Sequence, residues 1–203
     1  MTPDDVRELE RVLAAGGIAL FPADTVYGLA VDPGSESAVA RLYELKGRPP
    51  ARPSAVMFFD RGAALEELGW LGPRTREAAE HLLPGPVTLV LPNPERRWPL
   101  ACGPEPERVG VRVPALEGAL EPLRAATGPV LQSSANPSGG PDARRLADVD
   151  ERIRAGVDIE LDGGELPGTP STVIDLSTYE AEGSFDVLRE GVLPKARVVE
   201  LLA

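Results

Sequence analysis

Short apolar runs are the feature of this sequence that most limits the folds it can adopt. They recur along the whole chain between Gly, Pro, Asp or Ser residues: GIALF at 17–21, SAVMFF at 54–59, VTLVL at 87–91, RVGVRVP at 108–114, GPVLQS at 128–133, VDIEL at 157–161, STVIDL at 171–176 and FDVLRE at 185–190. Runs of this length and composition are typical of β-strands. Some are continuously apolar and others alternate, so they predict a mixed sheet of about seven strands.

Helical spacing occurs between several of these runs. Apolar residues recur every three or four positions over 3–15, which begins after Thr2 and ends at a Gly-Gly pair. A third helix is predicted over 73–83, before the turn PGP. The second predicted helix, 35–46, has Ser35 as its N-cap and four inward residues: Ala38, Val39, Leu42 and Leu45.

The order of these elements predicts one α/β domain over 1–203, a twisted mixed sheet flanked by helices. With 42% hydrophobic but only 4% aromatic residues, the core must consist mainly of Val, Leu, Ile and Ala. The first strand is expected to stop at Pro22, so that FPADTVYGL forms a loop.

Charge and composition exclude several function classes. A net charge of −11 argues against broad binding to nucleic acid. Cys102 and His81 are the only residues of their types, so an intrachain disulfide is excluded and zinc or Ser-His-Asp sites are implausible. We interpret His81 as a helix-cap residue and Cys102 as incidental. The acidic N-terminus and the lack of a long apolar run predict a cytoplasmic protein without a membrane segment.

Four loops at strand ends carry hydroxyl, amide or basic side chains: FPADTVYGL, ELKGRPPARPS, LQSSANPSGG, and GTPSTVIDL together with Arg189. Each alone could be an ordinary turn, in which Asp24 and Thr25 satisfy backbone groups. Together they favour one polar cleft at the strand ends. The sequence has neither a P-loop nor a Rossmann glycine motif. A triphosphate would therefore be held by arginines, a lysine and turn amides.

Lysine is scarce in this chain. Only Lys46 and Lys195 occur, and Lys46 lies near Arg48 and Arg52 in a loop shaped by glycine and proline. Such a loop suits phosphate oxygens, although a basic helix end also suits the helix dipole. A solvated loop charge adds little stability, so Lys46 and Arg48 are expected to be dispensable for folding.

Seven blocks of the sequence together resemble the YrdC-like threonylcarbamoyl-AMP synthases. They are FPADTVYGLAVDP, LYELKGRPP, LPGPVTLVL, VGVRVP, SSANPSG, STVIDL and LREG, in the family's order and over nearly the whole chain. The resemblance implies a short, single-domain YrdC-like fold. It also implies an enzyme that condenses L-threonine, bicarbonate and ATP, with Mg²⁺, into threonylcarbamoyl-AMP and pyrophosphate for the threonylcarbamoyladenosine modification of tRNA.

The resemblance also implies roles for individual residues. Lys46 and Arg48 would be catalytic, and no metal ligand is identified from the sequence. The ATP site would contain Lys46, Arg48, Arg52, Ser134, Asn136 and Arg189. The threonine site would contain Thr25, Arg112 and Ser171. Some family members have Asn at the position of Arg52 and His at that of Met57, which leaves the amino-acid specificity open.

Two alternatives remain at this point. One is a YrdC-like paralogue that binds RNA or nucleotides with little synthase activity, although the charge of −11 opposes RNA binding. The other is a carbamoyl-transfer domain like that of hydrogenase-maturation proteins, which belong to much longer chains with zinc-finger modules. For a synthase, we expect weak or indirect tRNA binding and transient contact with the tRNA threonylcarbamoyltransferase complex.

Overall fold

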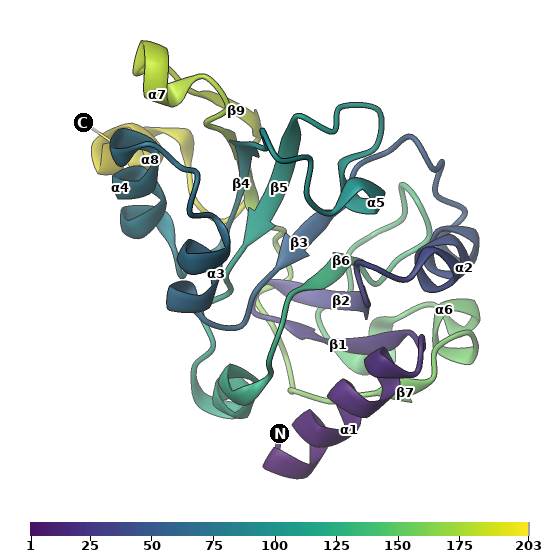
Figure 1. The fold of residues 1–203 in the computed structure, drawn as a ribbon. Helices are drawn as coiled ribbons and strands as arrows, with labels where there is room; N and C mark the ends of the chain where they lie inside the picture. Colours follow the sequence, from purple (N-terminus) through teal and green to yellow (C-terminus); the bar gives the residue numbers. More distant parts are fainter. Residues whose placement is uncertain (203) are drawn as a thin grey trace.

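The computed structural model describes residues 1–202, which form one nine-stranded mixed sheet with helices around it (Figure 1). The strand order is β7-β1-β2-β6-β3-β5-β4-β8-β9. Three neighbouring pairs are parallel (β1 with β7, β3 with β5, β4 with β8), and the others are antiparallel. The predicted mixed α/β sheet is confirmed. The strands are β1 (Ala19–Ala23), β2 (Val26–Val31), β3 (Ala55–Met57), β4 (Val87–Pro92), β5 (Arg108–Arg112), β6 (Val130–Ser134), β7 (Ile159–Glu160), β8 (Thr172–Asp175) and β9 (Asp186–Arg189).

Helices pack around both ends of the sheet. Helix α1 contacts β1 near the N-terminus, and α4 contacts α8 near the C-terminus (Figure 1). The α-helices are α1 (Pro3–Ala14), α2 (Glu36–Lys46), α3 (Arg61–Glu67), α4 (Pro73–Leu82), α5 (Pro99–Cys102), α6 (Glu151–Ala155), α7 (Tyr179–Glu182) and α8 (Lys195–Leu202). Two 3₁₀ helices are η1 (Gly118–Ala125) and η2 (Leu146–Asp148). Within residues 1–202, no helix combines the length and the apolar character needed to cross a bilayer.

Two of the three predicted helix starts, those of α1 and α2, are confirmed by their caps. Thr2 Oγ1 accepts from Asp5 N at 3.3 Å, while the Asp5 carboxylate accepts from Thr2 N at 2.7 Å. Ser35 Oγ accepts from Ala38 N at 3.3 Å. These bonds satisfy amide groups that a helix leaves without an internal partner. Gly47 ends α2 in the left-handed conformation with φ +59°, so the chain turns directly after Lys46.

The predicted end of the first strand at Pro22 is wrong. Strand β1 continues to Ala23, Pro22 pairs with Tyr27, and the segment expected to be a loop is a tight hairpin into β2. Strand β7 pairs only with Ala19 and Leu20, so β1 is an unpaired edge at Pro22, where a missing N–H is tolerated. Strand β2 was not predicted.

The buried face of α2 also differs from the prediction. Val39 and Leu42 are buried as expected, whereas Leu45 is only half-buried. Lys46 occupies the next inward position and is 2% exposed. The α2 helix therefore directs its only lysine into the protein.

Candidate functional site

A cavity of about 370 Å³ lies over one face of the sheet. Gln132 on β6 pairs with Ala55 on β3, which pairs with Gly110 on β5, which in turn pairs with Val90 on β4; all four line the cavity. Residues paired across neighbouring strands point to the same face. The cavity therefore exists because small residues occupy the centre of the floor. The predicted position at the strand ends is corrected, since the floor is the sheet face itself.

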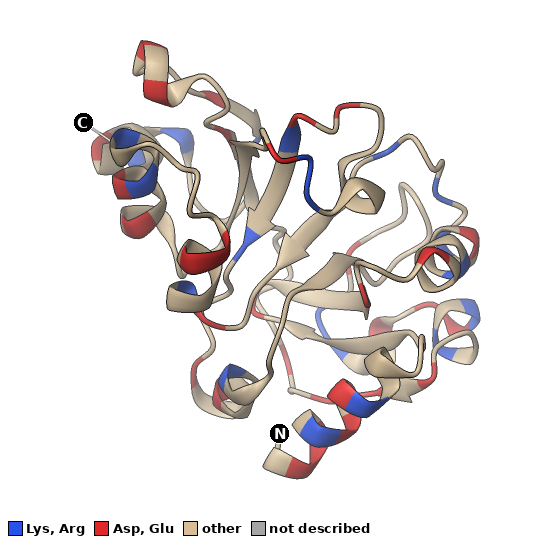
Figure 2. Cartoon of the chain, in the orientation of Figure 1, with Lys and Arg blue, Asp and Glu red and all other residues tan. Residues whose placement is uncertain are grey.

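Charged residues are sparse on the inner strands of this sheet, where the basic ones occur at the two ends of β5. Figure 2 shows the acidic and basic residues mainly on helices and loops, with blue at both ends of β5, where Arg108 and Arg112 lie. Both arginines line the cavity. An acidic protein thus has cationic groups at a concave, partly apolar surface, which is where anionic ligands bind most strongly.

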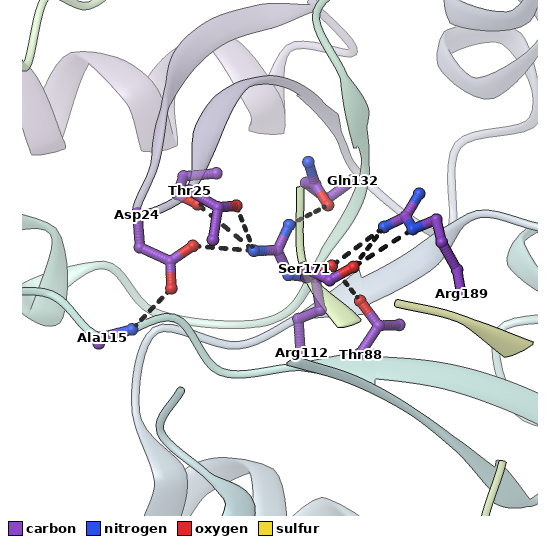
Figure 3. A network of polar contacts seen from close by, with 9 residues as sticks. Asp24, Thr25, Thr88, Arg112, Ala115, Gln132, Ser171 and Arg189 are labelled. Carbon is purple, nitrogen blue, oxygen red and sulfur yellow. Dashed lines mark hydrogen bonds and ion pairs between the residues drawn. The ribbon is translucent and has the colours of Figure 1, made fainter. Parts of the chain in front are cut away.

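Arg112 is held by hydrogen bonds to three side chains around the cavity (Figure 3). Its Nη2 donates to Asp24 Oδ1 at 2.8 Å and to Thr25 Oγ1 at 3.2 Å, and its Nη1 donates to Gln132 Oε1 at 3.2 Å. Asp24 Oδ2 accepts from the backbone N–H of Ala115 at 3.0 Å. Asp24 itself lies in the hairpin turn with φ +57°. The turn therefore fixes the carboxylate, which in turn fixes the guanidinium.

Burial sets the electrostatics of this ion pair. The side chains of Arg112 and Asp24 are only 5% and 7% exposed. Burial raises the pKa of Asp24, which Arg112 partly opposes, and burial lowers the pKa of Arg112. Arg112 Nε is buried and has no hydrogen-bond partner in the described chain. Arg112 is thus held in place by its partners, with Nε left as an unsatisfied buried donor within residues 1–202.

Ser171 and Arg189 form a second polar group of the cavity (Figure 3). Ser171 Oγ lies 2.9 Å from Thr88 Oγ1. Arg189 donates to the Ser171 carbonyl from Nη2 at 2.8 Å and from Nε at 3.2 Å. Burial lowers the pKa of Arg189, and the Asp142 carboxylate, which also lines the cavity, opposes this effect. The two hydroxyl groups therefore face a cavity with an arginine at one side.

Lys46 is a buried residue, so the expectation of a solvated loop charge is wrong. Its Nζ donates to the carbonyl oxygens of Ser134 and Asn136, the latter at 2.6 Å, and to Asn136 Oδ1 at 3.2 Å. Burial, with a smaller contribution from Arg48, lowers the pKa of Lys46 to about 8. The three oxygen acceptors favour the ammonium form. Lys46 is therefore a structural support of the turn after β6.

That turn, Ser134 to Gly140, is internally bonded. Ser134 Oγ donates to Asn136 Oδ1 at 2.6 Å, and Asn136 Nδ2 donates to Gly140 O at 2.5 Å. The N–H of Ser138 donates to the carbonyl of Lys46 at 2.8 Å. The end of α2 and the turn after β6 therefore form one unit, with Ser134 at the cavity wall.

Arg48 and Arg52 follow directly after α2. Arg48 Nε donates to Arg52 O at 3.3 Å and its Nη2 donates to Pro53 O, while the guanidinium lies 5.8 Å from the centre of the Tyr43 ring. Arg48 lines the cavity and helps to close its own loop. Arg52 is exposed, and its Nη1 lies 3.4 Å from Ser138 Oγ.

The structure brings the predicted site residues together to different degrees. Five line the cavity: Arg48, Arg112, Ser134, Ser171 and Arg189. Three others do not line the cavity but hold residues that do: Thr25 contacts Arg112, while Lys46 and Asn136 contact Ser134. Arg52 lies outside the cavity. Several lining residues were not predicted from the sequence, among them Thr88, Gly110, Gln132 and Asp142. Strand alternation places Gly110 on the same face of β5 as Arg112, which was a usable signal, but Asp142 had no signal of its own. His81 is exposed in the last turn of α4, and Cys102 is buried.

Comparison with known proteins gives the family. The Sua5/YciO/YrdC family, described as "Telomere recombination", matches residues 11–191. The chain belongs to the Sua5/YciO/YrdC family. The resemblance drawn from the seven sequence blocks is thereby confirmed. The predicted YrdC-like fold is confirmed as well.

Several proteins named threonylcarbamoyl-AMP synthase are similar to this chain in sequence. A threonylcarbamoyl-AMP synthase of Pyrococcus abyssi is 36% identical over 192 residues, 92% of this chain and 54% of that protein. One of Hahella chejuensis is 33% identical over 175 residues, 85% of this chain and 94% of that protein. The structure of P. abyssi Sua5 complexed with L-threonine has a TM-score of 0.81 at 31% identity, covering 99% of this chain and 58% of that one. This chain therefore spans about half of the archaeal relative and nearly all of the bacterial one.

Proposed function

We propose that this protein is a threonylcarbamoyl-AMP synthase that condenses L-threonine, bicarbonate and ATP into threonylcarbamoyl-AMP and pyrophosphate. The observation that carries the proposal is the cavity over the sheet face, with Arg112 anchored at one side and Arg189 at the other. Its relatives with this name, and the P. abyssi structure with threonine, support the same activity. Nucleotidyl transfer needs no Cys-His pair, and within residues 1–202 Cys102 lines the cavity without a histidine beside it.

The reaction needs positioning more than a protein nucleophile. The threonine nitrogen forms a bond to the bicarbonate carbon, water leaves, and a carbamate results. A carbamate oxygen then bonds to the α-phosphorus of ATP while the bond from that phosphorus to the bridging oxygen breaks. Pyrophosphate leaves with the electron pair. Holding three substrates in line supplies most of the acceleration in such a step.

The residues of the cavity divide between the two substrates. Arg112, a cation of the cavity wall, pairs with the threonine carboxylate, and the Ser171 and Thr88 hydroxyls bind other polar atoms of threonine. Arg48, Ser134 and Arg189 bind the nucleotide, because arginine forks and hydroxyls suit phosphate oxygens. Lys46 and Asn136 fix the Ser134 turn and reach the phosphates only if the turn rearranges.

Magnesium fits this arrangement as a partner of the triphosphate. Among residues 1–202, no cluster of three His, Cys, Asp or Glu side chains could hold a metal by itself. Mg²⁺ in nucleotide sites is often bound by one or two carboxylates together with phosphate oxygens. Asp142 is a carboxylate of the cavity wall near Arg189, so it would hold the ion. Bound there, Mg²⁺ would neutralise charge on the phosphates.

Product analysis tests the proposal directly. Mass spectrometry of a reaction with ATP, Mg²⁺, bicarbonate and threonine is expected to detect threonylcarbamoyl-AMP, with an equal amount of pyrophosphate. Omitting threonine or bicarbonate should remove both products. Calorimetry that detects ATP binding, combined with no adenylate under any of these conditions, would contradict the synthase and favour the nucleotide-binding paralogue. The cytoplasmic location, the weak or indirect tRNA binding and the contact with the tRNA threonylcarbamoyltransferase complex stay predictions.

A further inference from the structure

Gln132 is a buried polar residue of the cavity floor for which the proposed reaction has so far no role. Its side chain lies on β6 and the residue is 4% exposed. It is also the only glutamine of the chain. A buried amide is costly unless its groups are hydrogen-bonded, so its partners require an explanation.

Arg112 fixes the orientation of this amide. A guanidinium can only donate, so the atom that faces Arg112 Nη1 at 3.2 Å must be the oxygen Oε1. The nitrogen Nε2 then lies on the opposite side, as Figure 3 shows. In the described chain, no protein oxygen accepts from Nε2, and Gln132 lines the cavity, so Nε2 is left as a donor for a ligand there.

Gly28 shows where Nε2 lies on the floor. A Cβ at residue 28 would come within 2.7 Å of Gln132 Nε2, so glycine is needed for this close approach. Gly28 pairs across the sheet with Ser134, the residue that begins the nucleotide-binding turn. The Gln132 amide therefore extends from Arg112, at the amino-acid end, toward Ser134, at the nucleotide end.

We propose that Gln132 Nε2 donates to an oxygen of the carbamate while it forms and while it attacks ATP. This inference rests on the proposed function, because only there does a carbamate lie between an amino-acid carboxylate and an α-phosphate. The ligand atom must be an acceptor, since Nε2 can only donate. With one carbamate oxygen held by Gln132, the other oxygen is directed to the α-phosphorus. Gln132 thus binds the reacting group, and Gly28 positions Gln132.

Two variants remove the donor by independent routes. Gln132→Met keeps the length of the side chain without any N–H group. Gly28→Ala keeps the glutamine but displaces its amide, because the new methyl carbon would lie only 2.7 Å from Nε2. Gln132→Asn retains an amide on a shorter side chain and serves as the conservative comparison. Melting curves and circular dichroism establish that each variant is folded.

The readout is the dependence of product formation on bicarbonate, in CO₂-free buffer at saturating ATP and threonine. For Gln132→Met, kcat/KM for bicarbonate is expected to fall about a hundredfold, the scale for one lost preorganised donor. Gly28→Ala is expected to show the same defect to a smaller extent, and Gln132→Asn to retain more activity than Gln132→Met. The Kd values of ATP and threonine, measured by calorimetry, should stay within threefold.

Each contrary outcome has its own meaning. A wild-type protein that forms no threonylcarbamoyl-AMP overturns the proposed function and this inference with it. An active wild type whose Gln132→Met variant keeps kcat/KM for bicarbonate within threefold overturns the inference alone. Weakened threonine binding in Gln132→Met would assign the amide to the threonine carboxylate instead. Equal losses for all three substrates would assign it a structural role, and both results reject the carbamate contact.

Discussion

Replacing Lys46 by methionine tests the buried lysine most directly. Methionine has a similar unbranched length and an apolar side chain suited to the buried position at the end of α2, but it has no ammonium group. The substitution removes the three hydrogen bonds from Nζ to Ser134 and Asn136. It therefore leaves oxygens of the turn after β6 without their donor.

Two opposing effects determine the magnitude. Each hydrogen bond from a charged donor contributes about 2 kcal/mol to stability, so the loss of three costs about 6 kcal/mol. The pKa of Lys46, lowered from 10.5 to about 8, means that burying the charge costs about 3 kcal/mol, which methionine does not incur. The variant should therefore be less stable by about 3 kcal/mol. For a domain of this size, that lowers Tm by about 6 to 12 °C.

The assay is thermal and urea unfolding at pH 7, followed by circular dichroism. Lys195→Met is the matched control, because Lys195 is the only other lysine and is exposed at the start of α8. It should change Tm by no more than about 1 °C, as expected for a solvated charge. If Lys46→Met melts as the control does, Lys46 is not buried under this turn, and its assigned supporting role is refuted.

Three further predictions follow from the same geometry. Arg112→Met should destabilise the fold by about 3 kcal/mol in urea unfolding, because it leaves Asp24 buried without its cation. Calorimetry should show that the affinity for threonine falls far more than the affinity for ATP. Adding Asp24→Asn should restore part of the stability but none of the threonine affinity. Gly110→Ala should fold normally, since a Cβ at residue 110 meets no atom closer than 3.6 Å. In the same titrations it should lose affinity for both substrates, because the added methyl group occupies part of the cavity floor. Between pH 8 and 10.5, the wild type should gain stability relative to Lys46→Met by about 1.4 kcal/mol per pH unit in urea unfolding. The reason is that Lys46 keeps its proton in the unfolded chain but has lost it in the folded one. A stability difference that stays constant over this pH range would contradict the lowered pKa of Lys46.

Much of the fold follows from local signals. Ser35 and Gly47 mark the ends of α2 because capping depends on the residue itself and on its near neighbours. The β1–β2 hairpin was missed because Pro22 usually ends a strand, and only the sheet order makes β1 an edge at that position. The number of strands likewise depends on partners that lie far away in the sequence.

The site is less accessible to sequence reasoning. The burial of Lys46 could have been predicted, since it continues the helical spacing of Val39 and Leu42. The pairing of Arg112 with Asp24 could not, because 88 residues separate them and only the sheet order joins them. Gln132 stands out in the sequence as the only glutamine, but the orientation of its amide depends on the contact with Arg112, which the sequence does not give.

The position of β6 has a consequence for synthesis of the chain. Strand β6 lies between β2 and β3, which do not pair with each other, so it joins two parts of the sheet that precede it in the sequence. During translation, strands β1 to β5 leave the ribosome first as two separate sets. They cannot become one sheet until β6 arrives, and such distant pairing is slow. Because β6 also carries Gln132 and Ser134, a nascent chain has no complete cavity before that strand docks, and substrates cannot assist the earlier steps of folding.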